Sequence, residues 1–153
     1  MATETTIDAG LYEARTTRSA TRHLVTTGRI VLGLAFFVFG LNGFLNFLPP
    51  PSGPVPEGAM AFGGALMKTG YMFPLIKGTE VLVGFLLLSN LFVPLALVLI
   101  APVVVNIVAF HAFLAPSEIG IALVVLALEI ALAWSYRGAY RSILAVRAAP
   151  GSR

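Results

Sequence analysis

Cysteine is absent from this chain of 153 residues. The absence excludes disulfide bonds, thiolate nucleophiles, thiol–disulfide exchange and cysteine-ligated iron–sulfur clusters. Glycine-rich nucleotide loops are missing as well, because Gly63-Gly64 and Gly70 do not follow a predicted strand. Histidine occurs only twice, at His23 and His111. Most of the common redox and nucleotide-dependent mechanisms therefore lack their usual ligands.

Charged residues are also scarce. Only 11% of the residues are charged, whereas 58% are hydrophobic, and the mean hydropathy is +0.90. A water-soluble fold of this size could not hide so much apolar surface, so lipid is the expected solvent and the bilayer the expected partner. The net charge of +3 comes mainly from two arginine-rich ends, which indicates a membrane surface rather than nucleic acid.

Hydropathy predicts four membrane-spanning helices, at residues 30–48, 71–88, 91–113 and 119–134. Helices of roughly 17–23 residues match a hydrocarbon core of about 30 Å. Only Ser89 and Asn90 separate the second span from the third, so these two must form a tight helical hairpin. Before the fourth span, Ser117 is the predicted N-cap and Glu118 lies in the first helical turn. The predicted fold is an all-α, integral membrane four-helix bundle.

Arginine and lysine asymmetry predicts the orientation. Four arginines (Arg15, Arg18, Arg22, Arg29) precede the first span, and four (Arg137, Arg141, Arg147, Arg153) follow the last. The positive-inside rule therefore places both ends in the cytoplasm. We divide the chain into an arginine-rich cytoplasmic tail at 1–28, a transmembrane domain at 29–140 and a C-terminal tail at 141–153. The first tail is expected to be solvated and partly disordered, with a surface helix on anionic lipid as the alternative. No cleaved signal peptide is expected.

The long external loop at 49–69 has two halves. Five prolines should hold the first half extended. The second half, 57–68, sets Met60, Phe62, Leu66 and Met67 among small residues, which predicts a short interfacial helix. This segment either caps the bundle or forms a lid over a ligand.

Lys77 and Glu80 lie inside an otherwise apolar span. An ionisable side chain near the bilayer centre costs at least ~2.5–3.5 kcal/mol, so such residues usually face the bundle interior and mark a function. Their spacing of three residues puts both on one helix face, where they can neutralise each other. The pair is either part of a ligand site or a structural ion pair.

Topology brings further polar residues to similar depths and predicts a polar chamber in the outer half of the bundle. His111 either faces this chamber or sits at headgroup level, and Asn106 either faces it or bonds across helices. Glu129 is expected to be protonated or to pair with Lys77 or His111. The candidate ligand-binding or buried polar cluster is Asn42, Asn46, Lys77, Glu80, Asn106, His111 and Glu129.

Three short motifs carry a family resemblance: GLNGFLN at 40–46, KGTE at 77–80 followed by an apolar run with Gly84, and AP at 101–102 leading to NIVAFH at 106–111. With them, residues 28–140 resemble the DoxX family of small four-span bacterial membrane proteins. The resemblance implies a four-helix bundle in the bacterial inner membrane. It also implies an association with membrane redox chemistry, because the family name derives from a subunit of a thiosulfate:quinone oxidoreductase and a related protein is described in an oxidant-defence complex.

The residues argue against a self-sufficient oxidoreductase, and whether the chain belongs to an enzyme as a subunit stays open. His23 and His111 are predicted at opposite faces, so they cannot both ligate one haem. No ligand-spacing motif supports a metal site, and the chamber offers no serine for a serine–histidine–acid triad. No catalytic residue and no covalently bound cofactor are predicted.

Two functions remain. In the first, the chain is an accessory subunit of a membrane redox or quinone-linked system, and the chamber holds a quinone or lipid-like molecule. In the second, it is a non-catalytic assembly or interaction protein, whose polar cluster only specifies helix packing. Redox partner subunits and a homo-oligomer are compatible with either function.

Overall fold

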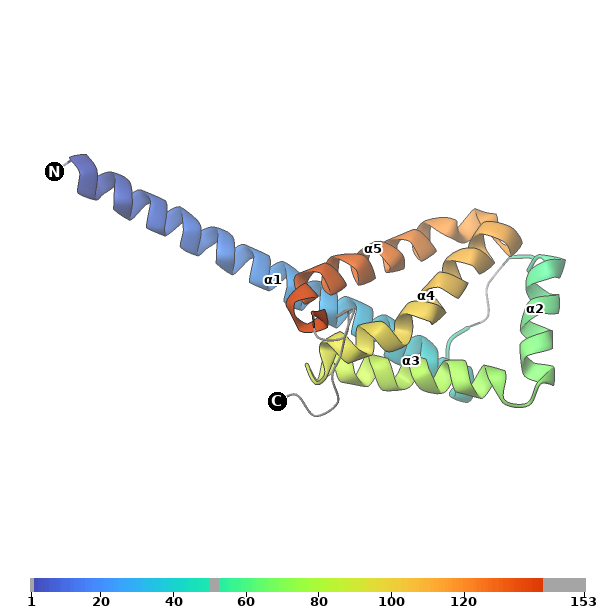
Figure 1. The fold of residues 1–153 in the computed structure, drawn as a ribbon. Coiled ribbons are helices and arrows are strands. Elements are labelled where there is room, and N and C mark those ends of the chain that lie inside the picture. The colour runs from blue at the N-terminus through green and yellow to red at the C-terminus, as the bar shows by residue number, and fades with distance from the viewer. Residues whose placement is uncertain (1, 50–52, 142–153) are drawn as a thin grey trace.

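The computed structural model describes residues 2–49 and 53–141, with side chains from Ala20 onward. The described residues contain helices and no strand, so the predicted all-α class is confirmed. The helices are α1 (Ala2–Leu45), α2 (Glu57–Lys68), α3 (Met72–Leu88), α4 (Val93–Leu114) and α5 (Ile119–Ser135), with short 3₁₀ turns η1 (Pro116–Glu118) and η2 (Arg137–Tyr140) (Figure 1).

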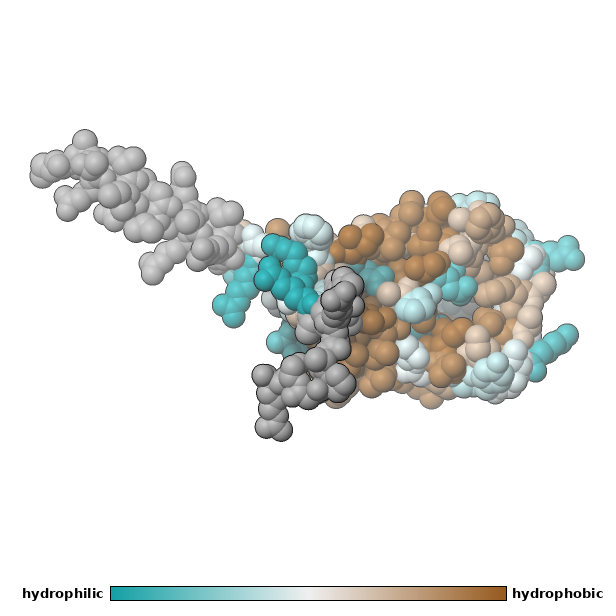
Figure 2. Space-filling model, viewed as in Figure 1, coloured by the Kyte–Doolittle hydropathy of each residue, from teal (hydrophilic) through white to brown (hydrophobic). Residues whose placement is uncertain are grey.

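Three segments are long and apolar enough to cross a membrane on their own: Ala20–Leu45, Val93–Leu114 and Pro116–Ser135. The pair α2 and α3, which meet at 93°, makes a fourth if they are taken together as one bent span. Brown apolar side chains cover the middle of the bundle in Figure 2, and hydrophilic ones gather toward its ends. The chain therefore has the build of a multi-pass membrane protein.

α2 occupies the residues predicted for the interfacial helix and lies across one end of the bundle (Figure 1), which we call the α2 end. Its Ala59 is buried, and its Phe62 ring lies 5.7 Å from that of Phe110 in α4. The turn into α3 places Gly70 at φ 76°, a left-handed conformation that favours glycine. α2 thus packs as a cap on the end of α4.

The opposite end, which we call the terminal end, holds the tight α3–α4 turn and the C-terminus of α5. Asn90 and Phe92 take left-handed φ values of 58° and 47° there. The guanidinium of Arg29 donates hydrogen bonds to the carbonyl oxygens of Leu87 and Leu88, the last residues of α3. Arg29 entered the sequence analysis only as one of the arginines that set the orientation. It is 8% exposed and satisfies helix C-terminal carbonyls that have no intrahelical partner.

Three other local predictions were wrong. α1 runs unbroken from Ala2, so the segment predicted to be partly disordered is helical. α1 also ends at Leu45 rather than at residue 48, because Asn46 turns to a left-handed φ of 49°. Ser117 does not cap α5, since η1 precedes that helix and makes no side-chain cap hydrogen bond. The predicted tail at 141–153 lies, after Arg141, outside the described residues.

Glycine lets α1 and α3 approach closely. A Cβ added at Gly84 would lie 2.6 Å from the Cα of Phe37, and one added at Gly40 would lie 2.8 Å from the backbone nitrogen of Val81. Real side chains do not tolerate such distances, so these positions need glycine for helix contact. Around this contact the core contains Leu32 and Phe36 from α1, Val83 and Leu87 from α3, Val93, Ala96, Leu97, Ile100 and Val104 from α4, and Leu132 from α5.

Candidate functional site

Lys77 and Glu80 form the ion pair that their spacing predicts. The Nζ atom of Lys77 lies 2.8 Å from Oε2 of Glu80. The Glu80 side chain is 6% exposed and that of Lys77 is 22% exposed, so the carboxylate is the more deeply enclosed partner. Lys77 also lies 6.0 Å from the centroid of the Phe73 ring, at the outer limit of a cation–π contact.

The stem of Lys77 lies directly over a glycine of α1. A Cβ added at Gly43 would come within 2.5 Å of Cγ and Cδ of Lys77, and one at Gly40 would come within 3.0 Å of the Glu80 Cβ. The two glycines therefore form a flat surface on which the ion pair rests. Space around the pair is filled by α1, which leaves it packed between two helices.

The asparagines at the end of α1 do not join this pair. The Oδ1 atom of Asn42 accepts a hydrogen bond from the backbone N–H of Leu48 at 2.7 Å. Asn46, which follows the helix, is exposed and left-handed. Both residues thus lie at the C-terminal end of α1, where backbone groups without intrahelical partners need other hydrogen bonds. Placing Asn46 in a buried cluster was wrong.

The polar side chains of α4 do not bond to the Lys77–Glu80 pair either. Asn106 is exposed on the surface of the bundle, and its side chain has no hydrogen bond to the part of the chain that the structure describes. The Nδ1 atom of His111 donates to the backbone carbonyl of Ile107 at 2.7 Å, and its ring meets Phe110 edge to face at 5.2 Å. Assigning Asn106 to a buried cluster was wrong, because its direction around α4 is toward the surroundings.

The fourth helix provides the second buried carboxylate, Glu129, which is 6% exposed. It pairs with neither Lys77 nor His111, and it makes no hydrogen bond or ion pair to residues that the structure describes. Glu129 lies in the half of α5 nearer the terminal end, whereas Lys77 lies in the half of α3 nearer the α2 end and Glu80 lies at the midpoint of α3. The seven predicted residues therefore do not converge on one chamber.

Glu129 instead borders an apolar groove of about 450 Å³ between α4 and α5. Aliphatic side chains make up most of its wall, and Ala101 and Ala133 leave the hollow because their side chains are small. Several wall residues are turned toward the surroundings of the bundle, among them Val105 (63% exposed) and Ile130 (58% exposed). The groove is lined by Leu97, Val98, Ala101, Val105, Leu126, Glu129, Ile130, Ala133 and Tyr140.

Tyr140 is the polar residue of this groove that sequence reasoning missed. Its hydroxyl oxygen is buried and has no hydrogen-bond partner in the described part of the chain. Burial, followed by the nearby Glu129 carboxylate and by Tyr136, raises the pKa of the Tyr140 phenol. The phenol therefore stays protonated near neutral pH and keeps a hydrogen-bond donor. The turn η2 returns Tyr140 toward α5, and that fold-back gave no signal in the sequence.

The site thus offers two unpaired polar groups at one edge of an apolar groove. Among the residues that the structure describes, no three histidine, cysteine, aspartate or glutamate side chains gather in a way that could hold a metal ion. No protein-family model, curated protein or solved structure matches this chain.

Proposed function

We propose that this protein binds a quinone or a similar lipid-like amphiphile in the α4–α5 groove, as an accessory subunit of a membrane redox system. The observation that carries the proposal is the pair of unpartnered polar groups, Glu129 and the Tyr140 hydroxyl, at an otherwise apolar groove. Ligand sites of this kind are mostly apolar, with a few placed polar groups that fix orientation.

The chemistry of the two groups suits a quinone head. The protonated Tyr140 phenol can donate to a quinone carbonyl, because it has no acceptor in the described chain. The Glu129 carboxyl can accept from a quinol hydroxyl as a carboxylate, or donate to a quinone carbonyl when it is protonated. The aliphatic wall would take the isoprenoid or acyl tail, and the exposed rim gives a tail access from the lipid.

The residues proposed for the site therefore differ from those expected from the sequence. Lys77 and Glu80 satisfy each other, whereas Glu129 and Tyr140 keep unused bonding capacity. The arginine distribution supports a cytoplasmic location for both chain ends. The motif resemblance to DoxX proteins supports the bacterial inner membrane and the redox association, and both remain proposals.

Mass spectrometry of the small molecules retained by the purified protein tests this function. Ala101→Phe should fill the groove and remove the bound amphiphile. Ala112→Phe is the matched control, because Ala112 is exposed on α4 and does not line the groove. Tyr140→Phe removes one hydrogen bond worth about 1 kcal/mol, so it should lower retention of a quinone about fivefold. Equal retention by Ala101→Phe, Ala112→Phe and the wild type would contradict the proposal.

The second function, assembly or interaction without a ligand, is supported by the Lys77–Glu80 pair. This pair packs against Gly43 and Gly40. Such packing is expected of an ion pair that specifies how α1 and α3 contact each other. The double variant Lys77→Met/Glu80→Gln separates the two functions. If it keeps its amphiphile while the α1–α3 contact weakens, the pair is structural and the ligand belongs to the groove. If no variant holds any amphiphile and the wild type holds none either, the assembly function is favoured.

A further inference from the structure

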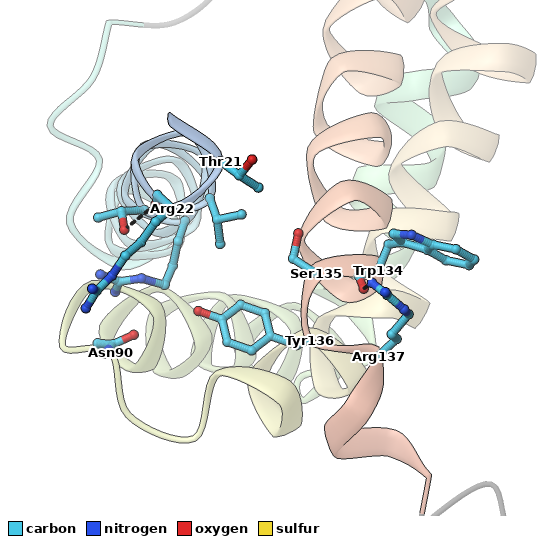
Figure 3. Close-up of a pocket in the computed structure, with 10 residues that line it drawn as sticks. Thr21, Arg22, Asn90, Trp134, Ser135, Tyr136 and Arg137 are labelled. Carbon is cyan, nitrogen blue, oxygen red and sulfur yellow. Dashed lines mark hydrogen bonds between the residues drawn. The ribbon is translucent and has the colours of Figure 1, made fainter. Parts of the chain in front are cut away.

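A second cavity, unrelated to the α4–α5 groove, opens at the terminal end of the bundle. Its volume is about 680 Å³, and it lies between α1, the α3–α4 turn and the end of α5 (Figure 3). Three of its lining residues are arginines and none is acidic. The lining residues are Thr21, Arg22, Val25, Thr26, Arg29, Asn90, Trp134, Ser135, Tyr136 and Arg137.

Three polar groups in this cavity have unused hydrogen-bonding capacity. No side-chain hydrogen bond joins the Arg22 guanidinium, the Asn90 amide or the Tyr136 hydroxyl to the described part of the chain. Figure 3 shows Arg22 and Asn90 on one side of the opening and the Tyr136 hydroxyl directed toward them from the other. These side chains come from three different elements, so the fold itself assembles them.

Arg29 and Arg137 supply positive charges whose positions in the cavity are fixed. Arg29 is fixed by its bonds to the last carbonyls of α3. Arg137 donates to the backbone carbonyl of Trp134 at 3.0 Å, and its guanidinium lies 5.4 Å from the centroid of the Trp134 ring. Because no carboxylate lines the cavity, these cations raise its potential and favour an anion.

Trp134 indicates the depth of the cavity relative to a bilayer. Its ring is 70% exposed at the last turn of α5, where an apolar span gives way to polar residues. Exposed tryptophans at the ends of spans sit at the headgroup level of membranes. Phosphate groups are the anions found at that level, and guanidinium, amide and phenol donors are the groups that recognise them.

We infer that this terminal-end cavity binds a phosphate group, with Arg22, Asn90 and Tyr136 as donors and Arg29 and Arg137 as fixed positive charges. The chemistry fits the headgroup of an anionic phospholipid and also a small soluble phosphate. The position of Trp134 at the lipid boundary favours the lipid. The site is separate from the α4–α5 groove, so it stands whether or not a quinone binds there.

The test measures lipid binding to the purified full chain by native mass spectrometry, with dioleoylphosphatidylglycerol as the probe and dioleoylphosphatidylcholine as the neutral comparison. We expect the anionic lipid to bind in preference. Arg22→Gln should weaken that binding about fivefold, since a basic residue near an anionic surface contributes about 1 kcal/mol. Asn90→Leu and Tyr136→Phe should each weaken it by a smaller factor.

Arg141→Gln is the matched control, because it removes the same charge at the same end but does not line the cavity. Equal losses in Arg22→Gln and Arg141→Gln would overturn the site in favour of diffuse attraction, and no loss in Arg22→Gln would overturn it outright. Competition with inorganic phosphate and glycerol 3-phosphate identifies the source. Displacement of the lipid by millimolar amounts of either would assign the site to a soluble phosphate, and persistence of the lipid would assign it to the membrane.

Discussion

Two helix pairs in this molecule each enclose a glutamate, but only one of the two glutamates has an ion-pair partner. In α1 and α3, glycines bring the backbones together and Glu80 is paired with Lys77. In α4 and α5, no glycine makes a close contact, and Glu129 lies unpaired beside a groove. The exposed fractions of the two glutamates are nearly equal, at 4% and 6%. Burial alone therefore does not distinguish the two glutamates, whereas the ion pair of Glu80 and the open space beside the unpaired Glu129 do.

The largest expected effect tests how closely α1 and α3 must pack. Gly84→Leu would place a side chain against the backbone of Phe37, which cannot move without separating the helices. Overpacking of this kind costs about 1–3 kcal/mol for a few extra methylenes, and more where backbone must shift. We expect the variant to lose its folded, monodisperse state in detergent, as seen by size-exclusion chromatography and circular dichroism.

Gly78→Leu is the control for this substitution. Gly78 lies on the same helix, and a Cβ there would meet nothing within 4 Å. It should fold like the wild type, because leucine has a better helix propensity than glycine. Similar behaviour of the two leucine variants would show that α1 and α3 are not in close contact.

The next effect comes from removing the paired glutamate. Glu80→Leu leaves the Lys77 ammonium without its partner, and breaking a buried ion pair in this way costs about 3–5 kcal/mol. We expect the lower end of that range, since the Lys77 side chain keeps 22% exposure. The double variant Lys77→Met/Glu80→Leu should recover most of the loss. Unfolding followed by denaturant titration would measure both, and a double variant no better than the single one would contradict the pairing.

The same substitution in the groove should have the opposite sign. Glu129→Leu removes an unpaired polar group from apolar surroundings, which should stabilise the fold by about 1–3 kcal/mol. It should also abolish amphiphile retention if the proposed function is correct. A destabilised Glu129→Leu would mean that the carboxyl has a structural partner, and it would remove the contrast between the two helix pairs.

The sequence predicts one of these regions better than the other, for a physical reason. Lys77 and Glu80 are near neighbours on a single helix, so their contact follows from helical spacing alone. The bounds of α2 likewise follow from the composition of 57–68. The break at Ser89 and Asn90 predicted the α3–α4 hairpin, but the turn is longer than two residues, because α4 begins at Val93 rather than at residue 91. Signals local in the sequence were enough to predict the ion pair and these elements.

The α4–α5 region could not be predicted in this way. Both helices are apolar nearly all round, so no hydrophobic face defines how each is rotated about its axis. That rotation decides that Asn106 faces outward and that Glu129 borders a groove. The contact of Arg29 with the end of α3 and the return of Tyr140 toward Glu129 depend on tertiary packing as well. The surroundings of Arg29, Asn106, Glu129 and Tyr140 were therefore not set by local signals.

The smallest expected effect concerns the phenol of the groove at alkaline pH. The pKa of Tyr140 is raised above its ordinary value of 10.0, first by burial and then by Glu129 and Tyr136. Between the unfolded and the raised folded pKa, the folded state holds more protons than the unfolded state. The contribution of the protonated phenol to the free energy of unfolding should therefore be fully present below about pH 10. It should be lost as the pH rises from there through the folded pKa.

Tyr140→Phe removes that dependence, so the unfolding free energy of the wild type should fall relative to that of the variant as the pH rises above about 10. Tyr71→Phe is the control, because Tyr71 is 64% exposed at the α2 end, away from the groove. Denaturant titrations at intervals from pH 8 to pH 11, values we choose to bracket the ordinary phenol pKa of about 10, would measure the slopes. If Tyr140→Phe and Tyr71→Phe changed the slope equally, the Tyr140 phenol would be solvated. The groove would then lose the only hydroxyl donor among its described lining residues.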